Sequence, residues 1–154
     1  MSIALTDSMS VLCITLKDYL DNNKANFGVF DVYYGDQDRI PRTPSICVEP
    51  GTKERQLNGA PRRTEVKITV YVIVYHCQIN NTEMIRNDDD LIADAVEEYI
   101  HANPFMKNRA DTEQVISSLV TRIESGYQTK KNSLFRASIL TVEMTSQVQL
   151  PTGV

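Results

Sequence analysis

The segment from Arg62 to Gln78 is the feature that most restricts what this chain can fold into. Its residues alternate as in a β-strand, and one face carries only β-branched side chains, namely Val66, Ile68, Val70, Val72 and Val74. The opposite face is polar up to Thr69 and then apolar, with Tyr71, Ile73 and Tyr75. Fully extended, the segment would span roughly 50 Å at about 3.3 Å per residue, which is longer than a small domain needs. The pattern therefore predicts a strand whose second half lies in a sheet covered on both faces and whose first half projects.

The residues before this strand predict its hairpin partner. A short strand is expected at residues 45–49, between Pro44 and Pro50-Gly51, because proline cannot donate to a strand ladder and lies at strand ends or edges. The polar residues that follow contain Asn58-Gly59, a favoured pair in tight hairpin turns. We therefore expect residues 45–75 to form a long β-hairpin whose tip stands off the core.

Two helices are predicted from apolar residues at three- and four-residue spacing. The first follows Thr6-Asp7, and its apolar face consists of Met9, Leu12, Cys13, Leu16, Tyr19 and Leu20. The second begins at Asn87 and the acidic run Asp88-Asp89-Asp90, because carboxylates favour the positive end of the helix dipole. It is expected to end before Pro104, since the residue preceding a proline avoids the helical conformation.

Three further strands complete the expected fold. Residues 29–34 are rich in β-branched and aromatic side chains and stop at Gly35-Asp36. Residues 115–129 favour a strand, although Val115, Leu119 and Ile123 also fit helical spacing. Residues 126–132 are typical of a turn, and residues 134–150 alternate again. The order predicts one α+β domain, in which two helices flank a mostly antiparallel β-sheet with a long projecting β-hairpin.

The sequence offers no credible active site. His76 and His101 are the only imidazoles, and their positions in a strand and at a helix end favour structural roles. A dyad of Cys77 with His101 would be the alternative for a small enzyme or ligand-binding domain, and it requires a pocket that holds both residues. No motif of a nucleotide-binding, protease or hydrolase site is present. No catalytic residue is assigned, and no cofactor is expected.

The cysteines and the acidic run do not predict a metal site. Cys13, Cys47 and Cys77 are widely spaced and are expected to be buried free thiols in a reducing compartment. Asp88, Asp89 and Asp90 are consecutive, so in a helical turn they point in different directions and mark a helix start. The N-terminal residues lack a secretory signal, and no apolar run approaches the ~20 residues of a membrane span. We expect a protein made in the cytosol and not bound to a membrane.

Charged residues are segregated along the chain. Residues 39–63 are mainly basic, through Arg39, Arg42, Lys53, Arg55, Arg62 and Arg63. Residues 83–98 are mainly acidic, through Glu83, Asp88, Asp89, Asp90, Asp94, Glu97 and Glu98. Two solvated surfaces would explain this pattern. A second explanation is that the basic hairpin of one copy meets the acidic helix of the next, a head-to-tail contact that closes into a ring when the rotation allows.

The layout of the chain resembles the tail terminator (tail completion) family, which are minor tail proteins of tailed bacteriophages. The segments that carry the resemblance are the amphipathic first helix, VFDVYYGD, RIPRTPSICVEPG, the tip RQLNGAPRRT, the valine-rich strand that ends VYH, and the acidic helix. The resemblance covers nearly the whole chain, so residues 1–154 are identified as a single tail-terminator-like domain.

The resemblance implies a structural protein of the virion that is not an enzyme. It implies a hexameric ring that caps the tail tube, ends tail elongation and joins the tail to the head or neck. The implied partners are other copies of the chain, the tail tube protein, a neck or connector protein and, in a contractile tail, the sheath protein. DNA would pass the lumen without specific binding, and assembly would take place in the host cytoplasm. By position, the subunit or tube interface would contain Arg55, Asn58, Arg62, Arg63, Asp88, Asp89 and Asp90.

Two other classes stay open at this point. The tail QVQLPTGV is equally suited to an arm that pairs with another protein's sheet edge, as in a neck or head–tail connector protein of the same virion. A regulatory module that binds nucleic acid through the basic hairpin is disfavoured by the net charge of −4.

Overall fold

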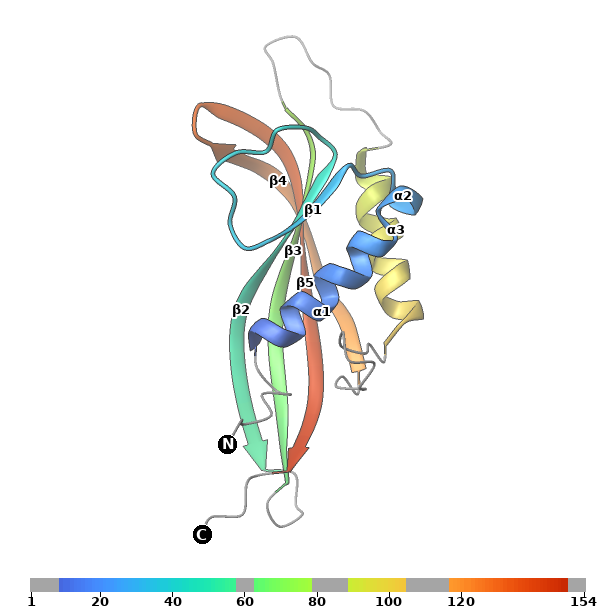
Figure 1. The fold of residues 1–154 in the computed structure, drawn as a ribbon, viewed down its shortest axis with the longest axis vertical. Helices are drawn as coiled ribbons and strands as arrows, with labels where there is room; N and C mark the ends of the chain where they lie inside the picture. The colour runs from blue at the N-terminus through green and yellow to red at the C-terminus, as the bar shows by residue number, and fades with distance from the viewer. Residues whose placement is uncertain (1–8, 58–62, 79–88, 105–116, 150–154) are drawn as a thin grey trace.

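The protein folds into one five-stranded β-sheet with helices packed on one of its faces (Figure 1). The computed structural model describes residues 9–57, 63–78, 89–104 and 117–149. The elements follow each other as α1 (Met9–Asn22), α2 (Lys24–Phe27), β1 (Asp31–Tyr34), β2 (Ser45–Leu57), β3 (Arg63–Gln78), α3 (Asp89–Ala102), β4 (Ser117–Lys130) and β5 (Ser133–Gln149). The predicted α+β class and the predicted order of elements are confirmed, and α2 is an additional short helix.

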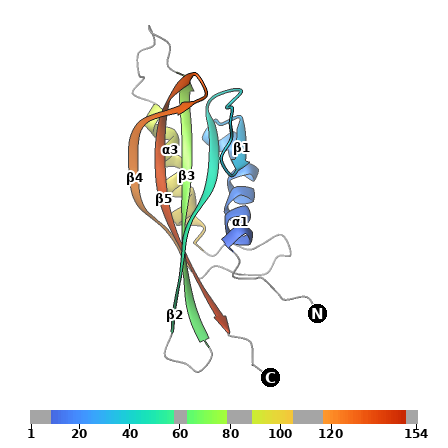
Figure 2. The same cartoon turned by 90° about the vertical axis from the view of Figure 1, so that its left-hand side faces the viewer.

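The sheet is mostly antiparallel, as predicted. Its strand order is β1-β2-β3-β5-β4, and the pair β1 and β2 is the one parallel pairing among the described strands. The long strand β3 lies in the centre, between β2 and β5. Figure 2 shows α3 behind the strands and α1 beside β2. Both helices pack against the same buried row of β3, so one face of the sheet carries the helices.

The main core lies between the sheet and the helices. The valine-rich row predicted for β3 is fully buried there, with 0% exposure at Val66, Ile68, Val70, Val72 and Val74. Apolar residues of the helices cover this row, chiefly Leu12, Leu16 and Leu20 of α1 and Ala93, Val96 and Ile100 of α3. Each large aliphatic side chain buried in this way contributes about 1.5–3 kcal/mol, so this layer is the principal source of stability.

A smaller core lies on the other face of the sheet, at the end where β3 finishes. The loop of residues 35–44, which joins β1 to β2 and is called the β1–β2 loop below, places Ile40 over this face. Ile40 packs with Cys47, Ile73, Tyr75, Phe135 and Ala137. The loop therefore explains why the second half of β3 is apolar on both faces, whereas Lys67 in the first half is exposed.

The expected end of β2 at Pro50-Gly51 is wrong. β2 continues to Leu57, with a register irregularity between Pro50 and Lys53. β1 pairs with β2 only as far as Val48. On that edge of β2, Pro50 therefore faces no described strand that would need its missing N–H group. Antiparallel pairing of β2 with β3 runs as far as Leu57 and Thr64. The expected turn at Asn58-Gly59 lies outside the described residues, and the projecting hairpin therefore stays a prediction.

The expected turn over residues 126–132 is also wrong. β4 runs through Gly126 to Lys130, and Lys130 pairs with Ser133, so the turn contains only Lys131 and Asn132. Lys131 adopts a positive φ of 51°, which suits a two-residue hairpin turn. The strand assignment for β4 is confirmed from Ser117 onward.

None of the helices in the described ranges is long and apolar enough to cross a lipid bilayer.

Replacing Gly51 by Ala is expected to lower the free energy of unfolding by about 1–3 kcal/mol, the usual cost of overpacking. A Cβ atom at this position would lie 2.6 Å from the Thr69 carbonyl oxygen and 2.9 Å from Cε2 of Tyr71. Urea unfolding of the two proteins measures the difference.

Gly126→Ala is the matched control, because a Cβ atom there has nothing within 4 Å. Its stability should be unchanged or slightly raised. Equal stability of both variants would show that Gly51 is not needed for the approach of β2 to β3.

Candidate interaction surfaces

The structure places the sequence-predicted interface residues at two separate ends of the molecule. Arg55 is exposed on β2, in register with Val66, and Arg63 is the first residue of β3. Asp89 and Asp90 begin α3, as expected of a helix start. Asn58, Arg62 and Asp88 lie outside the described residues, as do the side chains of Arg63, Asp89 and Asp90.

In the part of the chain that the structure describes, the strand ends that carry the basic residues lie far from the start of α3. The end of β2 and the start of β3 lie at the lower end of the molecule in Figure 1, whereas α3 begins near the upper end. Any contact between the two groups would therefore join different molecules. Their role in an interface stays a prediction.

The alternative dyad of Cys77 and His101 is wrong, because the two residues lie far apart along the sheet. His101 Nε2 accepts a hydrogen bond from the Val120 backbone N–H at 3.0 Å, and Val120 aligns through Val142 with Val70 of β3. Cys77 lies seven residues farther along β3, which corresponds to about 20 Å. His101 therefore holds the end of α3 against β4.

The other histidine and the buried thiols have structural positions. His76 is buried at a register irregularity of β3, and its Nε2 lies 2.7 Å from Ser138 Oγ. Burial raises the pKa of the Cys13 and Cys47 thiols to about 12, so both stay protonated at neutral pH and are poor nucleophiles. The expectation of buried free thiols is confirmed for these two, and Cys77 is partly buried.

Two ion pairs fix the β1–β2 loop at its two ends. Near its start, Asp36 accepts a hydrogen bond from Lys130 Nζ at the end of β4. Near its end, Arg42 forms a two-bonded contact with Asp31 of β1, with Nε–Oδ2 and Nη2–Oδ1 distances of 2.8 and 3.1 Å. The loop is thus attached to both edges of the sheet, although its residues are far from Lys130 in sequence.

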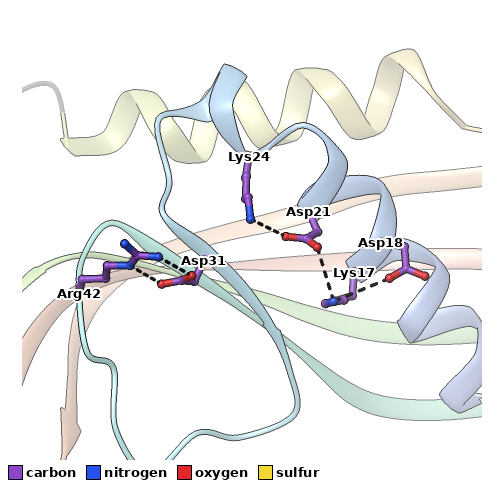
Figure 3. A network of polar contacts seen from close by, with 6 residues as sticks. All are labelled: Lys17, Asp18, Asp21, Lys24, Asp31 and Arg42. Atoms are coloured by element: carbon purple, nitrogen blue, oxygen red, sulfur yellow. Dashed lines mark hydrogen bonds and ion pairs between the residues drawn. The ribbon is translucent and has the colours of Figure 1, made fainter.

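Figure 3 shows the Arg42–Asp31 contact beside a chain of ion pairs on α1 and α2. Lys17 lies 3.7 Å from Asp21, and Asp21 lies 3.4 Å from Lys24. The Arg42 guanidinium also lies 5.1 Å from the ring centroid of Phe30, which is 49% exposed. The contacts on the helices are solvent-exposed pairs that stabilise the fold by about 0.2–1 kcal/mol each. The contact that matters for the surface is the one between Arg42 and Asp31, because it fixes the end of the loop.

The two carboxyl groups near Lys130 have pKa values shifted in opposite directions. The hydrogen bond from Lys130 holds the pKa of Asp36 below its usual value. Burial raises the pKa of Glu49, and the neighbouring Asp36 carboxylate raises it further. The side chain of Lys130 is 14% exposed and lies 5.9 Å from the ring centroid of Tyr75. These four groups form the polar side of the smaller core.

A cleft opens between the β1–β2 loop and the turn that joins β4 to β5, and it is called the loop–turn cleft below. Its volume is about 340 Å³. The cationic side chains in its wall are Arg39, Lys130 and Lys131, and the apolar ones are Ile40, Pro41 and Phe135. None of the described residues that line the cleft carries a carboxylate, which makes the cleft suited to an anionic group that carries apolar surface.

The sequence did not predict this cleft. Its cations come from two segments that are distant in the chain, and the sequence placed Lys130 and Lys131 within a longer turn. The signal that could have located it is Lys131-Asn132, a two-residue turn flanked by alternating strands.

Comparison with known proteins gives a fold relationship. A chain of the virion of a native gene transfer agent (GTA) particle superposes with a TM-score of 0.58 at 12% sequence identity. The match covers 94% of this chain and 99% of that chain. No family model and no curated protein matches the sequence. The similarity therefore concerns the fold, and it extends over nearly the whole of both chains.

Glu49→Gln is expected to raise the free energy of unfolding at pH 7. Because the folded protein raises the pKa of Glu49, ionising this carboxyl costs more in the folded than in the unfolded chain. This cost is present above the folded pKa and vanishes below about pH 4, where glutamate is protonated in both states. The advantage of the variant should decrease over the same range, as measured by urea unfolding at several pH values.

Glu54→Gln, at an exposed position on the same strand, serves as the control and should leave stability at pH 7 unchanged, because its side chain is not buried. A Glu49 variant that is less stable than the parent at pH 7 would contradict the assignment of the polar cluster.

Proposed function

We propose that this chain is a structural protein of a phage-like virion and works by assembly with other virion proteins. The observation that carries the proposal is the fold similarity to a chain of the gene transfer agent virion, which spans nearly the full length of both chains. The described surface supports an assembly role, because it has a cleft with three cationic side chains and exposes large apolar side chains such as Leu91 and Leu119.

The specific role we propose is that of a tail terminator. Copies of the chain would form a hexameric ring on the last ring of the tail tube, end tube growth and present the surface that joins the neck. The layout of the sequence, which resembles this family over nearly its whole length, supports this choice. The protein would reach its place in the virion during assembly in the host cytoplasm.

The elongated sheet suggests how the two charged ends are used. Arg55, Arg62 and Arg63, together with the polar Asn58, would form one interface at the end where β2 and β3 meet. Asp88, Asp89 and Asp90 would form another at the start of α3. Since these ends lie at opposite ends of the long axis in Figure 1, one is available to the tube and the other to a neighbouring subunit or the neck.

The purified protein is expected to form a ring-sized species, either alone or after mixing with the tail tube protein of the same particle. Six copies of 17.4 kDa correspond to about 104 kDa, a mass that light scattering or native mass spectrometry distinguishes from a monomer. A strict monomer in both samples would overturn the ring proposal.

Particles assembled without the protein distinguish a tail terminator from a neck or head–tail connector protein. Loss of a terminator leaves tail tubes of uncontrolled length when viewed by electron microscopy. Tails of normal length that lack heads would instead assign the chain to the neck or the head–tail connector.

A further inference from the structure

We propose that the loop–turn cleft of one copy receives the exposed acidic face of α3 from a second copy, as the lateral contact between neighbouring subunits. This inference rests on the proposed assembly and names the surfaces that make it. It differs from the end-to-end use of the basic hairpin, because both surfaces lie on the sides of the molecule.

The cleft provides positive charge that the fold leaves available. Lys130 is engaged by Asp36, whereas Arg39 and Lys131 are exposed and form no ion pair with any residue in the described part of the chain. The ion pairs at Asp36 and Arg42 hold the loop wall in place before a partner arrives. A preformed wall reduces the entropy lost on binding.

The surface of α3 is complementary in both charge and apolarity. Leu91, Asp94 and Glu98 lie on one side of the helix, since they are three and four residues apart, and all three are exposed. Leu91 is 62% exposed, an apolar side chain that the main core does not use. The helix contains no Lys or Arg between Asp89 and Ala102. Such a surface can place Leu91 against the apolar wall of the cleft and its carboxylates against Arg39 and Lys131.

The positions of the two surfaces fit a ring. In Figure 1 the β1–β2 loop and the β4–β5 turn lie at the upper left, and α3 lies at the right and begins near the same height. The sheet stands between them, so one copy cannot satisfy both surfaces by itself. A contact between different surfaces on opposite flanks is head-to-tail and adds copies side by side, and it closes when the rotation per copy allows.

Charge reversal on each side provides the test. Arg39→Glu with Lys131→Glu makes the cleft acidic, and Asp94→Lys with Glu98→Lys makes the helix basic. Each variant alone should assemble at least about ten-fold less well than the parent, because like charges then face each other. Assembly is measured by light scattering, with the tail tube protein present if the parent requires it.

Mixing the two variants in equal amounts should restore assembly. In an alternating ring every acidic cleft would face a basic helix, and every basic cleft would face an acidic helix. A ring of six copies accommodates this alternation. Restoration also shows that both variants are folded, so a failure of each variant alone cannot be attributed to misfolding.

Arg122→Glu is the matched control, since Arg122 is an exposed cation of β4 that lies neither in the cleft nor at the proposed basic end, and this variant should assemble like the parent. Raising the salt to ~1 M, where the Debye length is about 3 Å, should weaken parental assembly and reduce the difference between parent and variants.

Normal ring formation by either reversed variant would overturn the lateral contact and leave the virion role standing. Loss of binding to another virion protein, with ring formation intact, would assign the cleft to that partner and equally overturn the contact. A parent that never assembles would overturn the proposed ring itself.

Discussion

Burial of one whole face of β3, and of both faces in its second half, is the constraint on which the rest of the structure depends. The valine row fixes one face of the strand against α1 and α3, and this sets the register of β2 and β5 on either side. On the opposite face of β3, the buried apolar side chains are Ile73 and Tyr75, and Ile40 of the β1–β2 loop packs over them. If β3 were amphipathic throughout, the loop would have no apolar surface to pack against on that face of the sheet.

The surface chemistry follows from this arrangement. Because the loop must lie over the end of β3, it comes next to the turn between β4 and β5, and the Asp36–Lys130 pair holds the two together. The loop–turn cleft is therefore a by-product of covering the smaller core. The helices occupy the other face, so α3 is on the opposite flank from the β1–β2 loop and the β4–β5 turn that form the cleft (Figure 1). One burial requirement thus separates two surfaces of opposite charge.

Local patterns predicted the parts of the fold that depend on periodicity. The alternation in residues 62–78 predicted both faces of β3, and the spacing of Leu12, Leu16 and Leu20 predicted α1. The failures occurred where tertiary context decides. Pro50-Gly51 ends many strands, but here β2 passes through an irregularity beside Thr69, where glycine permits the close approach. The cleft was not predictable, because Arg39 and Lys131 become neighbours only after the loop has folded across the sheet.

The free edge of β2 has a consequence for how the protein behaves in solution. Beyond Val48 this edge faces no described strand, and unpaired strand edges invite indiscriminate strand addition and aggregation. Pro50 interrupts the row of donors at that edge, and Lys53, Glu54 and Arg55 place charges along it. These residues are typical of an edge protected against such pairing. A protein that must accumulate before it assembles would gain from this protection, because its edges would stay apart until the intended surfaces meet.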